Sequence, residues 1–336
     1  MKFMIAVLGC CLLLPALSAE AQFRKAKQPP LRVIFDTDMG PDYDDAGAIA
    51  LLHAYADSGY VTILATMAST KYEGVASVLN IFNTYFKRPD LPIGVPAVGL
   101  DMRDKQFWSD SLIARYPHHI TRNSQAVDAV TLYRKILAEQ PDHSVTLITV
   151  GFLTNIAHLL QSGPDQYSRL DGVSLVARKV KGMVSMAGKF PQGKEFNLIR
   201  DTAASYYVLR NWKLPLVYSG FEIGRKIKVG LKLIADTTIK ASPVKDVYRI
   251  CINKDKVDSA GRMSWDLTAV LVGMKGYAPF YSLQKGNILI YKDGSDAWQN
   301  SEKGKQAYLV EQMEHKQVEQ LLEHTMMHQP MAQPIQ

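Results

Sequence analysis

Half of one ten-residue segment near the N-terminus is aspartate. The segment runs from Asp36 to Asp45 and holds five aspartates. It follows a short apolar run, Leu31–Phe35, and leads into an alanine- and leucine-rich run that starts at Ala46. This pattern predicts a turn between a strand and a helix, at the strand's carboxyl end, where open α/β sheets place their sites. Five like charges this close repel one another strongly. We therefore expect a hard divalent cation with oxygen ligands, Ca²⁺ or Mg²⁺, and a carboxylate beside it can act as general base.

Simpler explanations account for only part of this segment. An aspartate at a helix start is usually an N-cap, which explains one or two of the five. An EF-hand loop needs glycine at its sixth position and glutamate at its twelfth, but Pro41 and Gly47 stand there. A phosphatase with a D-x-D motif after a strand leaves Asp42, Asp44 and Asp45 unexplained. The clustering therefore favours a metal site.

The first residues of the chain have the composition of an export signal. Lys2 precedes the apolar run Phe3–Leu17, and Ala19-Glu20-Ala21 forms a small-x-small cleavage site. We predict a signal peptide over residues 1–21, a mature domain over 22–336, and a periplasmic or secreted protein. The run is too short to span a membrane as a helix. A lipoprotein acylated at Cys10 or Cys11 is the alternative.

Composition limits the remaining classes of function. The chain has 336 residues, of which 47% are hydrophobic and 21% charged, as expected for one large α/β domain. Its net charge of +7 comes from scattered lysines and arginines without a nucleic-acid motif, so we expect no nucleic-acid partner. Without residues 1–21, Cys251 is the last cysteine left, so no intrachain disulfide is available. A small-molecule substrate fits best, and a homo-oligomer is left open.

Apolar runs and helix-like segments alternate along most of the chain. This alternation predicts a single α/β domain with a mainly parallel central sheet flanked by helices, an open α/β fold. The expected strands include Leu31–Phe35, Val61–Met67, Ser144–Val150 and Val180–Met186, and the expected helices include Asp45–Tyr55, Leu153–Gln161, Thr202–Asn211 and Trp265–Met274. Later, Tyr281–Leu283 and Asn287–Tyr291 predict a hairpin that turns at Gln284-Lys285-Gly286.

The acidic segment also resembles a known family signature. Asp36-Thr37-Asp38-x-Gly40-x-Asp42-x-Asp44-Asp45, followed by an alanine-rich helix, is similar to the opening of the nucleoside hydrolases, the inosine–uridine-preferring N-ribohydrolase superfamily. The best-known members carry the shorter form D-x-D-x-G-x-D-D. Because this chain has two additional residues, Asp42 and Tyr43, it resembles a divergent branch.

Later segments match the same family. Val150-Gly151-Phe152-Leu153-Thr154-Asn155 resembles a strand end at which a backbone carbonyl, here that of Val150, binds calcium. Glu195-Phe196-Asn197 matches the triplet whose glutamate and asparagine hold ribose hydroxyls. Asp266 stands where the family has its last metal-binding aspartate, and Trp265 stands at the position of a histidine found in several members. Thr70 replaces an asparagine near the ribose. Glu222, in Tyr218–Gly224, is interpreted as either a substrate contact or a structural cap.

The resemblance implies a Ca²⁺-dependent hydrolase that cleaves the N-glycosidic bond of ribonucleosides. The implied metal ligands are Asp38, Asp45, Asp266 and the Val150 carbonyl. The implied base is Asp44, or Asp42 because the insertion leaves the register open. The implied substrate contacts are Glu195, Asn197, Phe196, Trp265 and Thr70.

Three other functions remain open from the residues. One is a related glycosidase on another glycosyl substrate, and a second is a metal-dependent phosphohydrolase. The third is a secreted nucleoside- or sugar-binding protein that keeps the metal cage without turnover.

Overall fold

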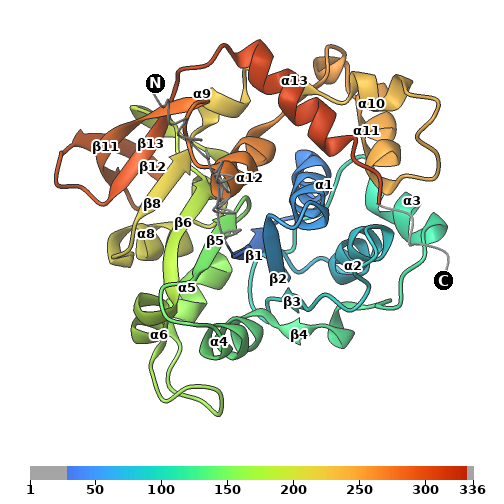
Figure 1. Cartoon of the computed structure of the whole chain (residues 1–336). Helices are drawn as coiled ribbons and strands as arrows, with labels where there is room; N and C mark the ends of the chain where they lie inside the picture. Colours follow the sequence, from blue (N-terminus) through green and yellow to red (C-terminus); the bar gives the residue numbers. More distant parts are fainter. Residues whose placement is uncertain (1–28, 331–336) are drawn as a thin grey trace, which may run out of the picture.

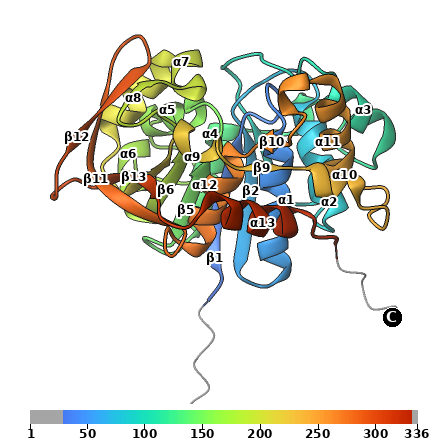
Figure 2. The same cartoon turned by 90° about the horizontal axis from the view of Figure 1, so that it is seen from above.

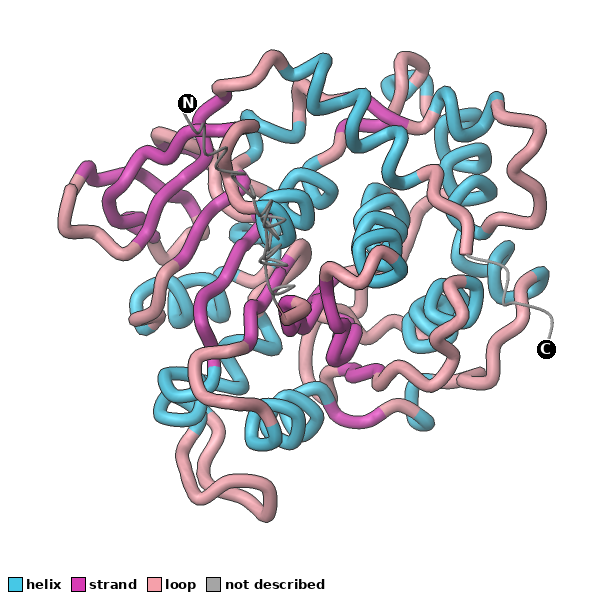
Figure 3. Tube along the Cα trace, in the orientation of Figure 1, coloured by secondary structure: helices cyan, strands magenta, loops and turns pink. Residues whose placement is uncertain are grey.

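One large sheet organises the chain, of which a computed structural model describes residues 29–330. Figure 3 shows its strands running through the molecule between helices. The strands are β1 (Leu31–Thr37), β2 (Val61–Ala68), β3 (Ile93–Val95), β4 (Val127–Asp128), β5 (Val145–Thr149), β6 (Val180–Met186), β7 (Gln192–Lys194), β8 (Leu216–Ser219), β11 (Tyr281–Ile290), β12 (Ser295–Asn300) and β13 (Gln306–Glu311). Their order across the sheet is β4-β3-β2-β1-β5-β6-β8-β13-β11-β12-β7 (Figure 1). The strands from β4 to β13 in this order are parallel, and β11, β12 and β7 extend the sheet antiparallel. A separate pair, β9 (Lys228–Val229) and β10 (Arg262–Met263), is antiparallel.

Helices cover both faces of this sheet (Figures 1 and 2). They are α1 (Asp44–Asp57), α2 (Val75–Tyr85), α3 (Trp108–Arg115), α4 (Ala129–Glu139), α5 (Thr154–Gln161), α6 (Gly172–Lys179), α7 (Phe196–Arg200), α8 (Thr202–Asn211), α9 (Phe221–Gly224), α10 (Leu231–Ala235), α11 (Pro243–Lys254), α12 (Trp265–Lys275) and α13 (His315–Met326), with 3₁₀ turns at Asn123–Gln125 and Lys256–Asp258.

The described residues form two hydrophobic cores, one on each face of the sheet, and successive residues of β1 belong to them in turn. Because successive strand residues point to opposite faces, Val33 and Phe35 of β1 join one core and Ile34 joins the other. The first core contains residues of α1, α2, α12 and α13, and the second contains residues of α4, α5, α6 and α8. Strands buried on both faces become nearly continuous apolar runs, which is why they were visible in the sequence.

The acidic segment connects β1 to α1 beside the end of β5. Asp36 is aligned with Thr149, so the chain leaves both strands at the same edge of the sheet. Gly151 makes this close approach possible, because a Cβ atom there would lie 2.3 Å from the Asp38 backbone nitrogen. The position of Asp38 therefore depends on a residue without a side chain on the neighbouring strand end.

The structure confirms the predicted fold and corrects one element. The expected hairpin turn at Gln284-Lys285-Gly286 lies inside one continuous strand, β11, and the chain turns later, between Ile290 and Ser295. Gly286 serves packing instead of a turn, because a Cβ atom there would lie 2.5 Å from Trp298 Nε1. The predicted signal peptide, residues 1–21, lies outside the described residues and stays a prediction. Within residues 29–330, we find no helix with the length and apolar character needed to cross a membrane.

We predict that Gly151→Ala destabilises the protein by about 1–3 kcal/mol, the usual cost of forcing a methyl group into a packed site. The matched control is Gly163→Ala, because a Cβ atom at Gly163 meets nothing within 4 Å. Denaturant unfolding of both variants measures the difference. Equal midpoints for Gly151→Ala and Gly163→Ala would show that the two strand ends adapt without cost.

Candidate active site

A cavity of about 270 Å³ lies at the carboxyl ends of β1, β5 and β6. We call it the acidic cavity. It is lined by Asp38, Pro41, Asp42, Asp44, Asp45, Val150, Met186, Glu195, Phe196, Asn197, Phe221, Trp265 and Asp266. The fold therefore brings together all the predicted site residues except Thr70, from segments more than 200 residues apart in the chain.

Three carboxylates converge in this cavity. Asp44, Asp45 and Asp266 each offer an oxygen, and these oxygens lie within 4.8 Å of one another. Asp44 Oδ2 accepts hydrogen bonds from the backbone N–H groups of Trp265 (2.9 Å) and Asp266 (3.1 Å), which fixes the start of α12 against the start of α1. Asp45 accepts a hydrogen bond from the Thr37 hydroxyl, and its second oxygen is buried without a protein partner. A buried carboxylate oxygen without a partner is costly, so this set is suited to a cation.

Burial without a cation shifts the acidity of these groups. Burial raises the pKa of Asp45 to about 7, and the neighbouring Asp44 adds to the effect. Burial and then the Asp42 charge raise the pKa of Asp44 to about 6, against the opposing effect of Arg262. Burial, together with the charges of the surrounding aspartates, raises the pKa values of Asp38 and Asp266 well above their usual range. The cluster thus resists full ionisation unless positive charge is supplied.

Two predicted metal ligands border this trio. Asp38 lines the cavity but does not belong to the convergent set, whereas Asp44, the predicted base, does. The Val150 carbonyl accepts a hydrogen bond from Asn197 Nδ2 at 3.0 Å. Because a carbonyl oxygen has two lone pairs, this bond leaves room for a metal at Val150. The donor set therefore fits a hard divalent ion held by carboxylate and carbonyl oxygens.

The predicted sugar-binding pair lines the same cavity. Glu195 and Asn197 are only 2% and 5% exposed, so they are not solvated surface residues. Glu195 Oε1 accepts from the Asn197 N–H (2.8 Å), and Oε2 accepts from the N–H groups of Leu198 (3.2 Å) and Gly188 (3.3 Å). Burial raises the pKa of Glu195 to about 7. Asn197 Nδ2 also donates to the Met186 carbonyl at 3.1 Å, so both side chains have fixed orientations.

Aromatic rings complete the lining. Trp265 and Phe221 are stacked with ring centroids 5.5 Å apart, and Trp265 Nε1 donates to the Phe221 carbonyl at 2.8 Å. Phe196 is 39% exposed. Phe221 was not predicted, although it belongs to the Tyr218–Gly224 stretch that the sequence placed near the site. Such rings can stack on a flat heterocycle.

An unpredicted arginine binds the two inserted residues. Arg262 is buried, pairs with Asp42, and lies 3.5 Å from Asp44 and 3.3 Å from Asp258. Its guanidinium also covers the Tyr43 ring at 4.7 Å, and the Tyr43 hydroxyl donates to Asp258 at 2.6 Å. Both candidate bases are thus held in place, Asp42 by an ion pair and Asp44 by backbone amides. Their catalytic role stays a prediction.

Three other residues singled out from the sequence lie outside the lining. The Thr70 hydroxyl donates to the carbonyls of Leu100 (3.0 Å) and Met102 (2.9 Å), so the structure does not bring it to the cavity. Asp36 accepts from the Tyr133 hydroxyl (2.7 Å) and from Asn155 Nδ2 (3.1 Å), which fixes β1 to α4 and α5. Glu222 accepts a hydrogen bond from the Phe190 backbone N–H at 3.1 Å. Of its two interpretations, this contact favours the structural cap over the substrate contact.

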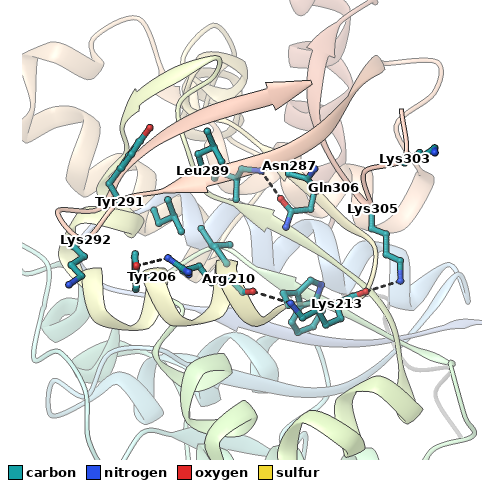
Figure 4. Close-up of a pocket in the computed structure, with 14 residues that line it drawn as sticks. Tyr206, Arg210, Lys213, Asn287, Leu289, Tyr291, Lys292, Lys303, Lys305 and Gln306 are labelled. Atoms are coloured by element: carbon teal, nitrogen blue, oxygen red, sulfur yellow. Dashed lines mark hydrogen bonds between the residues drawn. The ribbon is translucent and has the colours of Figure 1, made fainter. Parts of the chain in front are cut away.

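A larger hollow of about 800 Å³ lies elsewhere, between α8 and β11 (Figure 4). Its charged lining residues are the exposed cations Arg210, Lys213, Lys292, Lys303 and Lys305, and no carboxylate lines it. A divalent cation would be repelled there. The smaller acidic cavity is therefore the better candidate for the active site.

Known proteins resemble this chain in sequence and in fold. The sequence profile described as inosine-uridine preferring nucleoside hydrolase matches residues 33–320. The chain therefore belongs to this family. A pyrimidine-specific ribonucleoside hydrolase, RihA of Salmonella paratyphi B, is 27% identical over 205 residues, and the match covers 59% of this chain and 63% of that relative.

Solved structures share the fold at low sequence identity. A plant nucleoside hydrolase is similar with a TM-score of 0.67 and 18% identity, covering 89% of this chain and 99% of that one. A purine-preferring ribonucleoside hydrolase from Gardnerella vaginalis is similar with a TM-score of 0.68 and 14% identity, covering 88% and 98%.

We predict that the loss of stability with rising pH occurs in the absence of a divalent cation and is abolished in its presence. The carboxyls of Asp44 and Asp45 titrate near pH 4 when unfolded, but at about 6 and 7 in the fold. Their contribution to stability is therefore complete below about pH 4 and is lost as the pH rises through 6 to 7. In a chelator, the melting temperature should fall by several degrees between pH 5 and pH 8. With saturating divalent cation it should stay level or rise, because binding favours the ionised carboxylates.

Thermal melts across this pH range, with the chelator or with each of several divalent ions, measure the effect. Asp45→Asn should lose most of the metal-induced stabilisation. Superimposable pH profiles in chelator and in metal would contradict a cation site in the acidic cavity.

Proposed function

We propose that the protein is a Ca²⁺-dependent N-glycosyl hydrolase that cleaves ribonucleosides to free base and ribose. The observation that carries the proposal is one cavity that joins a convergent carboxylate trio to a buried glutamate–asparagine pair and an aromatic wall. Family membership supports the reaction class. A phosphohydrolase does not require the glutamate–asparagine pair and the aromatic wall beside the trio, whereas a nucleoside-binding protein would share all three features and differs from the enzyme in turnover.

The residues divide into three roles. When bound, Ca²⁺ supplies a water of lowered pKa and an anchor for sugar hydroxyls. The residues that would hold it are Asp38, Asp45, Asp266 and the Val150 carbonyl. Asp44 takes a proton from the attacking water, with Asp42 as the alternative base.

Substrate binding is assigned to the other walls. Glu195 and Asn197 Oδ1 accept hydrogen bonds from the sugar hydroxyls, because both N–H groups of Asn197 Nδ2 already donate to backbone carbonyls. Binding energy is thereby used to place C1′ beside the water. Charge develops at C1′ as the bond to the base breaks, as in other glycoside hydrolyses. Trp265 and Phe221 pack against the leaving base.

The decisive experiment is release of free base from a nucleoside panel. The panel must contain purines and pyrimidines, because one relative is named pyrimidine-specific and a similar structure purine-preferring. We expect turnover of at least one ribonucleoside, loss of turnover after chelation, and recovery with Ca²⁺. Release of inorganic phosphate from phosphate esters would favour the phosphohydrolase. Metal-dependent binding of nucleosides without turnover would favour the binding protein.

Paired variants separate the base from the metal ligands. Asp38→Ala should lose both bound calcium and activity, because it removes a ligand. Asp44→Asn should keep calcium and lower kcat by at least about a hundredfold, the usual contribution of general-base catalysis. Metal content and steady-state kinetics of each variant measure these effects. If Asp44→Asn loses calcium while Asp42→Asn keeps it and is inactive, the base is Asp42 and Asp44 is a ligand, as the convergent trio allows.

A further inference from the structure

The loop between β6 and β7 is held by three carboxylates from three parts of the chain. The backbone N–H groups of Gly188, Lys189 and Phe190 are consecutive, and each donates to a different acid. Gly188 donates to Glu195 (3.3 Å), Lys189 to Asp296 (3.1 Å) and Phe190 to Glu222 (3.1 Å). We call Gly188–Phe190 the clamped loop. Successive amides that point at separate carboxylates fix the path of the backbone at every residue.

Two of these carboxylates lie away from the acidic cavity, Asp296 buried and Glu222 half-buried. Asp296 on β12 is 2% exposed, and Glu222 on α9 has one buried oxygen without a partner. Neither lines the cavity. Burial raises the pKa of Asp296 to about 7 and raises the pKa of Glu222. The Lys189 charge opposes this rise in pKa at both carboxyls but does not cancel it, and its ammonium lies over the Phe221 ring, 5.5 Å from the centroid.

Removing one carboxylate fully and a second one partly from water is a costly way to satisfy two backbone amides. Main-chain or neutral side-chain acceptors would do so with a smaller desolvation penalty. Perturbed, buried acids of this kind gather around functional sites.

The clamped loop is hydrogen-bonded to the predicted sugar-binding pair through Glu195. It precedes Glu195 by a few residues. The Glu195 carboxylate accepts from the Gly188 N–H in the clamped loop and from the Asn197 N–H in α7, so it joins the loop to its partner in the pair. The opposite side is tied to the aromatic wall, because the Phe221 N–H donates to the Gly188 carbonyl at 2.9 Å. Movement of the loop would thus displace Glu195 and Phe221 together.

We propose that Asp296 and Glu222 are positioning residues, which clamp Gly188–Phe190 so that Glu195 and Asn197 face the sugar in the acidic cavity. The inference rests on the proposed function for its substrate. It predicts that loosening the clamp weakens substrate binding more than it slows the chemical step, because no carboxylate of the trio lies on this loop, on α9 or on β12.

The test compares truncating and conservative variants. Asp296→Ala and Glu222→Ala should each raise KM for the best nucleoside by roughly tenfold, with kcat changed less than about threefold. Asp296→Asn and Glu222→Gln should recover most of the affinity, because an amide oxygen still accepts from the loop N–H. The matched control is Asp293→Ala on the same hairpin, since Asp293 is exposed and pairs with Lys194 at 3.0 Å. It should leave KM unchanged.

A second readout separates positioning from general damage. The calcium-induced rise in melting temperature should persist in all four clamp variants, because the metal ligands lie on other segments. Unchanged KM in both alanine variants, or a KM change no larger than that of Asp293→Ala, overturns the inference. A KM change accompanied by loss of the calcium effect also overturns it, because the whole site would then be disturbed.

Failure of the proposed function is distinguishable from failure of the clamp. If the unmodified protein turns over no nucleoside, the proposed function fails, and calorimetric titration with ribose in the presence of Ca²⁺ takes the place of KM. A roughly tenfold loss of ribose affinity in Asp296→Ala, recovered in Asp296→Asn, then supports the clamp. No loss, or no ribose binding by the unmodified protein, overturns it.

Discussion

Mutual repulsion among buried carboxylates is the constraint on which the rest of this structure depends. Asp38, Asp44, Asp45 and Asp266 are all buried at one edge of the sheet, where burial and proximity both disfavour their ionised forms. The fold can hold them because hydrogen-bond donors stabilise some of their oxygens and a cation can bind the others. The backbone amides at the start of α12 hold Asp44, the Thr37 hydroxyl holds Asp45, and the partnerless oxygen of Asp45 remains for a positive ion.

A layer of neutral polar groups supports this charged centre from below. Tyr133 and Asn155 hold Asp36, and Asn155 also donates to the Ala68 carbonyl at 2.7 Å, so β1 and β2 end in a fixed relation to α5. Ser69 Oγ accepts from the Phe152 N–H at 3.0 Å beside Gly151. Side chains that these hydrogen bonds hold in one orientation are preorganised. A metal site or a sugar site binds more weakly when its residues must first be ordered.

The sequence carried enough information to predict the fold and most of the cavity lining, but not Phe221 in that lining or Arg262 beside it. Val180–Met186 and Thr202–Asn211 have the predicted bounds, because buried strands and amphipathic helices have a periodic pattern. Phe221 and Arg262 lie on α9 and β10, which are four and two residues long and too short for any period. The Arg262–Asp42 pair joins positions 220 residues apart, which no local pattern encodes. The order of the aspartates in the sequence also does not show which three carboxylates converge, because their convergence depends on how α1 packs against α12.

The distance in sequence between the two halves of the cavity has a consequence for how the protein folds. The contacts of Asp44 with Trp265 and of Tyr43 with Asp258 close loops of 221 and 215 residues. Contacts this distant form late, because the entropy of closing such loops must be overcome before the contacts stabilise anything. During synthesis, the acidic segment leaves the ribosome long before α12 exists, and it stays in water, where its repulsion is screened. The cavity is thus among the last parts to assemble, so a chain interrupted before α12 carries most of its carboxylates and no site.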